Sequence, residues 1–281
     1  MSRKQIDRRA IAFSLTVAVA LWSPVIGQVS TNVPEVVPGA RPMIVVFPDS
    51  KTVHNGSMYS NSVTTGHFED YIWRDVVSYI DEHYRTLPDR DNRGLVGHSM
   101  GGYGVSRIGM KHPDVFGSLY VMSPCCMSPR GAGPSNPAGE EALAAVKTPA
   151  DSAKLPFGLR TQLAAAAAWS PNPQNPPLYF DLPVGPNQQA VLAKWAANAP
   201  LAFIDQYIEN LRRYRALAID VGDQDNLKTD TSRLHEILDT YNVKHAFEIY
   251  PGTHTSHVAF RFQDHVMPFF STSLSFAAPR R

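Results

Sequence analysis

One short stretch of the chain holds a serine whose neighbours suit nucleophilic chemistry. Residues 97–101 are Gly-His-Ser-Met-Gly, with an apolar run over 93–97 before them and a helical pattern after them. A G-x-S-x-G sequence between a strand and a helix is typical of a sharp bend that exposes the serine hydroxyl. We expect glycine at Gly97 and Gly101 because side chains there would collide across the bend. The pattern therefore predicts Ser99 as a nucleophile; the alternative is an ordinary turn serine.

A serine nucleophile needs further groups, and the chain offers candidates for each of them. The peptide N–H of Met100, at the start of the following helix, is expected to stabilise an oxyanion. The serine also needs a histidine base and an acid that orients this base. In proteins whose nucleophilic serine lies on a strand-to-helix bend, the acid follows the serine along the sequence and the histidine follows the acid. The acid candidates, at the end of one late strand, are Asp220, Asp223 and Asp225. The base candidates, just after the last strand, are His254 and His257.

Each of these groups also has a simpler interpretation. The aspartates could form a surface turn or a loose cation site, although they lack the fixed spacing of a calcium loop. The pair His254 and His257 could bind a metal, but no third ligand lies near it in the sequence. His98 is expected to point away from the bend and to pack. The other histidines are expected on the surface or at helix ends: His54, His67, His83, His112, His235, His245 and His265. We expect neither a metal nor an organic cofactor.

Short apolar runs alternate with helical patterns along most of the chain. Predicted strands cover residues 43–47, 93–97, 116–123, 216–222 and 245–250. Predicted helices cover residues 67–85, a segment after Ser99, 200–215, 230–242 with Asp230 or Thr231 as its cap, and 257–270. This alternation predicts an α/β fold with a mostly parallel sheet.

Residues 127–200 depart from this alternation. The segment is rich in proline, alanine and asparagine, so we expect short helices joined by extended loops. A long insertion of this kind is interpreted either as a lid or substrate wall or as a structural cap. Its aromatic residues could line a substrate site or pack in a core: Trp169, Tyr179, Phe180 and Trp195, together with Tyr59 outside it.

Composition excludes several classes of protein. Apolar residues make up 43% of the 281 and charged residues 18%, which is ordinary for a globular protein. A net charge of +1 gives no field that would attract nucleic acid. The two cysteines, Cys125 and Cys126, are adjacent, so we expect no disulfide framework and interpret both as small, partly buried apolar residues.

The N-terminus has the pattern of an export signal. Four basic residues within the first nine precede an apolar stretch over 10–22. We predict a signal peptide over residues 1–27, a linker over 28–40 and one catalytic domain over 41–275. Localisation would then be secreted or periplasmic, with no stable membrane span after cleavage; an uncleaved anchor is the alternative.

Several stretches together resemble a known esterase family. They are "RPMIVVFPDS", "GSMYSNSVTTGHFEDYI", "YIDEHYRT", "RGLVGHSMGGYGVSRIGMKHPDVFGSLYVMSPCC" and "FEIYPGTHTSH". That family includes esterase D, feruloyl and acetyl-xylan esterases and the mycobacterial mycolyltransferases. The resemblance implies an α/β-hydrolase fold. It places the nucleophile on Ser99, favours Asp225 over Asp223 as the acid, and favours His254 over His257 as the base.

One part of the family pattern is missing. Family members carry two or three strands before the one that corresponds to residues 43–47, and a loop among them supplies the second oxyanion N–H. No His-Gly turn precedes Met43 here, so the chain resembles a member without its front strands. Loss of one oxyanion donor lowers turnover by about 10²- to 10³-fold. Missing strands would also expose an edge of the sheet.

Two functions follow from this reasoning. The first is a secreted serine esterase that acts on small-molecule or carbohydrate-linked esters through an acyl-enzyme; attack by a sugar hydroxyl would make it an acyltransferase. The second is a truncated, weakly active or non-catalytic homologue that binds carbohydrate or a partner.

Overall fold

The computed structural model describes residues 40–129 and 136–277, in two units that are Met1–Asp49 and Ser50–Arg281. The predicted signal peptide and residues 28–39 of the predicted linker lie outside the described residues. In the first unit, the strand predicted over 43–47 is wrong, because only Val46 makes an isolated bridge. A β-branched run becomes a strand only where a neighbouring strand takes up its backbone hydrogen bonds.

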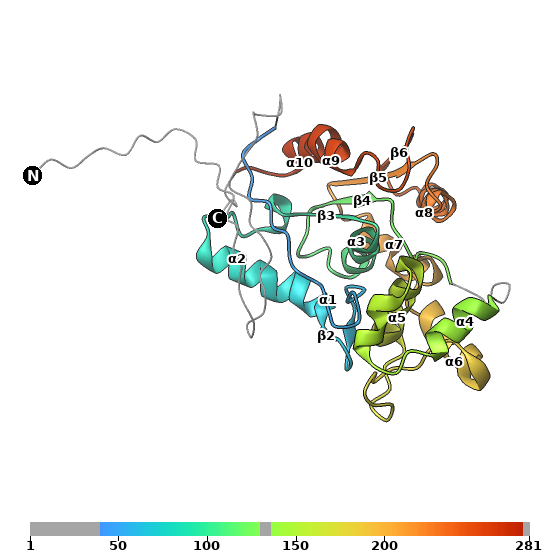
Figure 1. The fold of residues 1–281 in the computed structure, drawn as a ribbon. Coiled ribbons are helices and arrows are strands. Elements are labelled where there is room, and N and C mark those ends of the chain that lie inside the picture. Colours follow the sequence, from blue (N-terminus) through green and yellow to red (C-terminus); the bar gives the residue numbers. More distant parts are fainter. Residues whose placement is uncertain (1–39, 130–135, 278–281) are drawn as a thin grey trace, which may run out of the picture. The chain divides into compact units, whose positions relative to one another are not determined.

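The second unit is built on a parallel sheet (Figure 1). Its strands lie in the order β3 (Gly94–His98), β4 (Ser118–Met122), β5 (Ala216–Gly222) and β6 (Ala246–Tyr250). All three pairings are parallel, as the sequence predicted. Among the described strands, β3 is at an edge of this sheet. The carboxyl ends of the four strands therefore meet at one rim, where the loops that follow them can share a site.

Alternate side chains of the strands face two different helical layers. Leu119 and Val121 of β4 join the apolar cluster of α3 (Met100–Lys111) and α8 (Lys228–Thr240). Tyr120 points the other way, onto Phe269 of the C-terminal helix. That helix comprises α9 (Val258–Arg261), a π turn over Phe262–Val266 and α10 (Met267–Ser273). Helices thus cover both faces of the sheet, because side chains alternate along a strand and those on both sides of β4 are buried.

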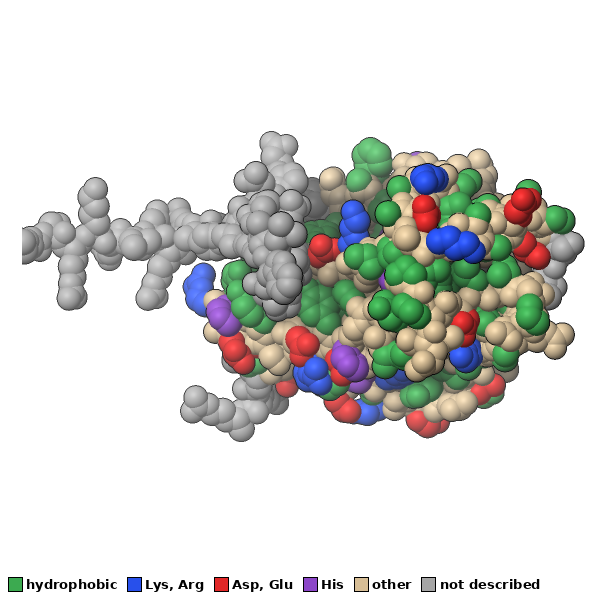
Figure 2. All heavy atoms as spheres, turned by 60° about the horizontal axis from the view of Figure 1, so that its bottom comes forward, with side chains coloured by type: hydrophobic (Ala, Val, Ile, Leu, Met, Phe, Trp, Pro, Cys, Tyr) green, Lys and Arg blue, Asp and Glu red, His purple; other side chains and the backbone are tan. Residues whose placement is uncertain are grey.

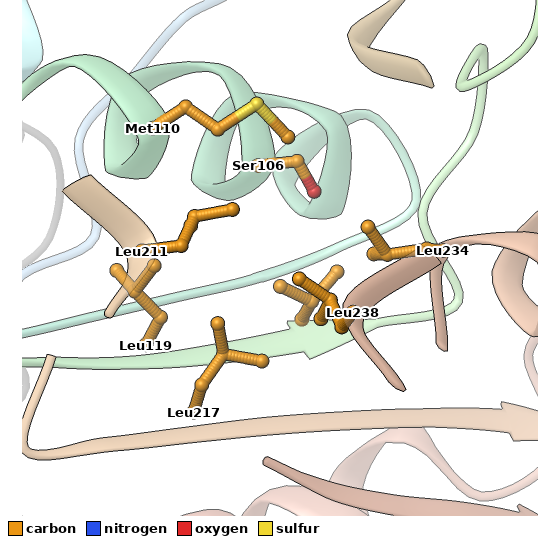
Figure 3. A pocket seen from close by; sticks show the side chains of 8 residues that line it. Ser106, Met110, Leu119, Leu211, Leu217, Leu234 and Leu238 are labelled. Atoms are coloured by element: carbon orange, nitrogen blue, oxygen red, sulfur yellow. The ribbon is translucent and has the colours of Figure 1, made fainter. Parts of the chain in front are cut away.

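The core between α3, α8 and the sheet contains a small void. Figure 3 shows Leu119 of β4, Leu217 of β5 and two leucines of α8 pointing toward Met110 and Ser106 of α3. The void measures about 10 Å³, which is scarcely room for one water. Its lining is Ser106, Met110, Leu119, Val121, Leu211, Leu217, Leu234 and Leu238. The lining is almost wholly apolar, so this void is a packing feature and not a substrate site.

The helix predicted over 67–85 forms as a continuous helical segment. It comprises α1 (Phe68–Asp70), a π turn over Tyr71–Val76 and α2 (Val77–His83), and it follows the two-stranded hairpin of β1 (Asn61–Ser62) and β2 (Gly66–His67). Buried Glu69 of α1 binds Arg107 and Lys111 of α3. This cluster of charges joins the helical segment to the helix that begins after Ser99.

The insertion has an apolar core of its own. It contains α4 (Pro137–Ala144), α5 (Phe157–Trp169) and α6 (Gln188–Ala196), with short 3₁₀ turns at Pro149–Lys154 and Gly185–Asn187. Trp169, Phe180 and Trp195 are buried in this core together with Tyr103 of α3, whereas Tyr179 is exposed. Trp169, Phe180 and Trp195 therefore pack in a core, which is the second of the two interpretations, whereas Tyr179 does not.

Two helix boundaries differ from the sequence prediction. The helix predicted over 200–215 is broken into 3₁₀ turns at Pro200–Ala202 and Ile204–Tyr207 and a short α7 (Ile208–Leu211), followed by a turn. Helix α8 begins at Lys228 rather than near residue 230, with Leu227 at the capping position. Asp225 accepts the amide of Leu227, so this carboxylate, rather than Asp230 or Thr231, supports the start of the helix.

The surface carries charges of both signs. On the face in Figure 2, acidic and basic side chains are interspersed with apolar ones. This mixture agrees with the net charge of +1. Within the part of the chain that the structure describes, no helix has both the length and the apolar character that a membrane crossing requires.

Candidate active site

Ser99 lies on a strained bend between β3 and α3. Its φ of 58° and ψ of −114° are unusual for a residue with a side chain. A Cβ at Gly97 would lie 2.3 Å from the backbone of Gly101, so the bend requires glycine at position 97. A Cβ at Gly101 would meet nothing within 4 Å, so the expected collision does not apply there. The steric explanation is therefore right for the first glycine and wrong for the second.

The loops after β5 and β6 are hydrogen-bonded to each other along their backbones. A Cβ at Gly222 would lie 2.3 Å from the carbonyl oxygen of Gly252, which shows how closely they approach. The amide of Gly252 donates to Oδ1 of Asp223 at 2.8 Å, and the amide of Gln224 donates to the carbonyl of Gly252 at 3.0 Å. These bonds fix the register between the acid loop and the histidine loop.

That register brings three distant side chains into one hydrogen-bonded chain. Nε2 of His254 lies 2.9 Å from Oγ of Ser99, and Nδ1 of His254 lies 2.8 Å from Oδ2 of Asp225. The Asp225 side chain is 1% exposed, whereas that of His254 is 33% exposed. The acid is thus shielded from solvent, and the imidazole between acid and hydroxyl remains accessible.

The competing candidates have other partners. Asp220 is buried and accepts from the hydroxyl of Tyr120 and the guanidinium of Arg261. Burial raises the pKa of Asp220, although Arg261 opposes that effect. The carboxylate of Asp223 accepts the amide of Gly252. His257 is exposed, and its Nδ1 is hydrogen-bonded to Oγ of Ser256. None of these three side chains has a described hydrogen bond to Ser99 or His254.

His98 has a contact that the sequence did not predict. Its ring does not point away from the site: Nε2–H donates to the carbonyl of His254 at 2.8 Å, and the two ring centroids are 4.5 Å apart. Burial lowers the pKa of His98, which disfavours the charged form of this ring. The only signal in the sequence was that His98 is adjacent to Ser99, and adjacency does not reveal a contact across 156 residues.

Met100 combines two features expected of an oxyanion site. It is the first residue of α3, where amides have no acceptor within the helix and where the helix dipole is positive. Its side chain packs against the insertion's apolar cluster, as do those of Cys125 and Cys126. The amide of Cys125 donates to the carbonyl of Ser99 at 3.0 Å. Both cysteines are partly buried, as the sequence predicted.

The arrangement defines a class of protein. A parallel sheet covered by helices on both faces, with a serine on a strand-to-helix bend after β3 and loops after β5 and β6 that reach it, is the α/β-hydrolase fold. A sequence profile of the family described as "Putative esterase" matches residues 37–270. The chain belongs to this esterase family, as its resemblance implied. A direct search of curated proteins found no match.

Solved structures have the same fold at low sequence identity. A ferulic acid esterase superposes with a TM-score of 0.56 at 21% identity, covering 83% of this chain and 72% of its own. The fluorophosphonate-binding serine hydrolase FphF of Staphylococcus aureus gives 0.53 at 19%, covering 82% and 72%. MPT51 (FbpC1) of Mycobacterium tuberculosis gives 0.54 at 15%, covering 83% and 78%. At these identities the likeness supports the fold alone.

Proposed function

We propose that the chain is an exported serine esterase that hydrolyses carboxylic esters through an acyl-enzyme. The observation that carries this proposal is the hydrogen-bonded chain from Ser99 through His254 to Asp225, at 2.9 and 2.8 Å. Membership of the esterase family and the buried position of the acid support it. Export by residues 1–27 is the sequence-based part of the proposal.

The proposed mechanism follows from the two hydrogen bonds. His254 donates Nδ1–H to Asp225, which leaves the lone pair of Nε2 directed at the Ser99 hydroxyl. Oγ attacks the acyl carbon while Nε2 takes its proton, and the carboxylate stabilises the resulting imidazolium. His254 then gives the proton to the leaving alkoxide. Water hydrolyses the acyl-enzyme by the same proton transfers in reverse order.

Charge that develops on the carbonyl oxygen needs donors already in place. The amide of Met100, in the first turn of α3, is the donor we assign from the bend.

The proposed substrates are small-molecule or carbohydrate-linked acyl esters. Hydrolysis by these residues requires no cofactor. One neighbour is named as a ferulic acid esterase, which makes aromatic acyl esters a reasonable first set to assay. An acceptor sugar hydroxyl in place of water would give acyl transfer through the same residues.

Hydrolysis of p-nitrophenyl acetate and butyrate tests the proposal. We expect turnover by the wild-type protein and a loss of at least about 10³-fold in Ser99→Ala, because the nucleophile is removed. Ser78→Ala is the matched control, since Ser78 is an exposed serine on α2, and it should retain full activity. Equal background rates in wild type and Ser99→Ala would overturn the proposal and favour the non-catalytic binding protein.

A further inference from the structure

A second cluster of ionisable side chains lies away from Ser99. His235 and Asp239 are on α8, one turn apart, and His245 comes just before β6. Nδ1 of His235 is 2.8 Å from Nε2 of His245, and Nε2 of His235 is 3.4 Å from Oδ2 of Asp239. One ligand atom from each of the three residues can be chosen such that all lie within 4.8 Å of one another.

The buried histidine is oriented by the backbone. The His245 side chain is only 2% exposed, and its Nδ1–H donates to the carbonyl of Val243 at 2.8 Å. This bond fixes the tautomer and leaves the lone pair of Nε2 directed toward His235. A histidine that binds a metal through one nitrogen characteristically donates its other N–H to a carbonyl or carboxylate in this way.

The other two side chains are positioned on the side open to solvent. The ring of His235 stacks on Phe247, with centroids 4.2 Å apart and an interplanar angle of 19°. The carboxylate of Asp239 is 63% exposed, so an ion can reach the cluster from solvent. A hydrogen bond thus holds His245 and stacking holds His235, while the exposed carboxylate of Asp239 leaves the cluster open to solvent.

The cluster has a surplus of acceptors. Nε2 of His245 and both oxygens of Asp239 are acceptors, and Oδ1 of Asp239 is 3.9 Å from that Nε2. An imidazole with one N–H can donate to only one of the two neighbours of His235, so a divalent cation among the three groups would satisfy the remaining lone pairs.

We propose that His235, Asp239 and His245 form a binding site for a divalent transition-metal ion, with Zn²⁺ the best match. Imidazole nitrogens and a carboxylate are ligands that Zn²⁺ prefers, at roughly 2.0–2.2 Å, which corresponds to about 3.4 Å between tetrahedral ligands. The two histidine nitrogens, now 2.8 Å apart, would separate by about half an ångström. Water would take the fourth position.

The site is distinct from the proposed esterase site. His245 precedes the amino end of β6, whereas His254 follows its carboxyl end. The intervening strand of five residues spans about 16 Å. A metal ion bound at this site would therefore have a structural effect. It would link α8 to the start of β6, the strand that leads to the loop of His254.

Calorimetric titration of chelator-treated protein with ZnCl₂ tests the proposal. We expect saturable binding of one ion per chain, tetrahedral absorption bands when Co²⁺ replaces Zn²⁺, and an increase in Tm with Zn²⁺. His235→Gln and Asp239→Asn should each weaken affinity at least about tenfold. Asp239 is exposed, so its variant should fold normally.

His83→Gln is the matched control. His83 also stacks on an aromatic ring, that of Tyr79, and its Nδ1 also bonds to a carbonyl. Among the residues that the structure describes, no acid completes a three-residue cluster with it. Zinc affinity should be unchanged in this variant. Absence of saturable binding, or binding that survives both His235→Gln and Asp239→Asn, would overturn the proposal. Binding lost only in His254→Ala would overturn it too, because the ion would then occupy the esterase site.

Discussion

The buried carboxylate of Glu69 should control the acid stability of the protein. Its side chain is 9% exposed, and it accepts from Nε of Arg107 at 2.6 Å and from Nζ of Lys111 at 2.8 Å. Burial raises the pKa of Glu69, but its contact with His112 and the charges of Arg107 and Lys111 outweigh burial. The net result is a pKa of about 2, against an ordinary value of 4.5.

This lowered pKa sets both a magnitude and a pH range. Each pH unit is worth about 1.4 kcal/mol, so the native contacts of the ionised carboxylate contribute about 3 kcal/mol at neutral pH. Because the folded pKa is below the unfolded one, the contribution is complete above about pH 4.5 and falls as the pH approaches 2. By pH 3, about 2 kcal/mol of it should be lost.

Urea unfolding of wild type and Glu69→Gln at pH 7 and pH 3 measures this contribution. The amide keeps the shape and removes the charge, leaving two cations unpaired, so we expect a loss of about 3 kcal/mol at pH 7. The difference between the proteins should shrink to about 1 kcal/mol at pH 3. Asp75→Asn is the control, since Asp75 pairs with Arg74 on the surface with both side chains 52% exposed, and it should change stability by less than about 0.5 kcal/mol. A Glu69→Gln loss below about 1 kcal/mol at pH 7, or one that does not depend on pH, would refute the reasoning.

Three further substitutions address the proposed active site. Asp225→Asn should keep the fold and lower kcat by about 10⁴-fold, because an amide no longer holds the reactive tautomer of the histidine; unchanged kcat would remove the acid from the mechanism. His98→Ala removes the donor to the histidine loop and should lower kcat by roughly tenfold with little change in KM, whereas an equal change in both would indicate a substrate contact. Gly97→Ala places a Cβ 2.3 Å from the backbone of Gly101 and should abolish activity and lower Tm. Gly158→Ala is the control: a Cβ there meets nothing within 4 Å, and the variant should raise Tm slightly. Equal thermal stability of the two variants would contradict the steric explanation.

Much of the sheet was predictable because its strands are short apolar runs. Four of the five predicted strands formed within two residues of their expected limits. The run over 43–47 has the same composition and failed, because composition does not specify the neighbouring strand that a ladder needs. Helix boundaries near residues 200 and 228 also escaped prediction: Pro200 begins a 3₁₀ turn rather than an α-helix, and the Asp225 carboxylate accepts the amide of Leu227 just before α8.

The candidate site was only partly readable from the sequence. The bend at Ser99 follows from local pattern, because glycine at position 97 has a steric cause. Sequence spacing could not choose among three aspartates as the acid or between two histidines as the base. The choice depends on the contact between Gly222 and Gly252 that aligns their loops, and this contact exists only in the folded chain. The contact of His98 with the histidine loop, and the cluster of His235 with His245, likewise join residues whose proximity no local pattern encodes.

Reaction with a fluorophosphonate probe tests the central claim most directly, because only an activated serine reacts rapidly with it. Intact mass and peptide mapping should find one adduct, on Ser99, in the wild-type protein. The adduct should be absent in Ser99→Ala and should form at least about 10²-fold more slowly in His254→Ala, which lacks the base. A wild-type protein that stays unlabelled, or an adduct that forms equally in Ser99→Ala, would contradict the account.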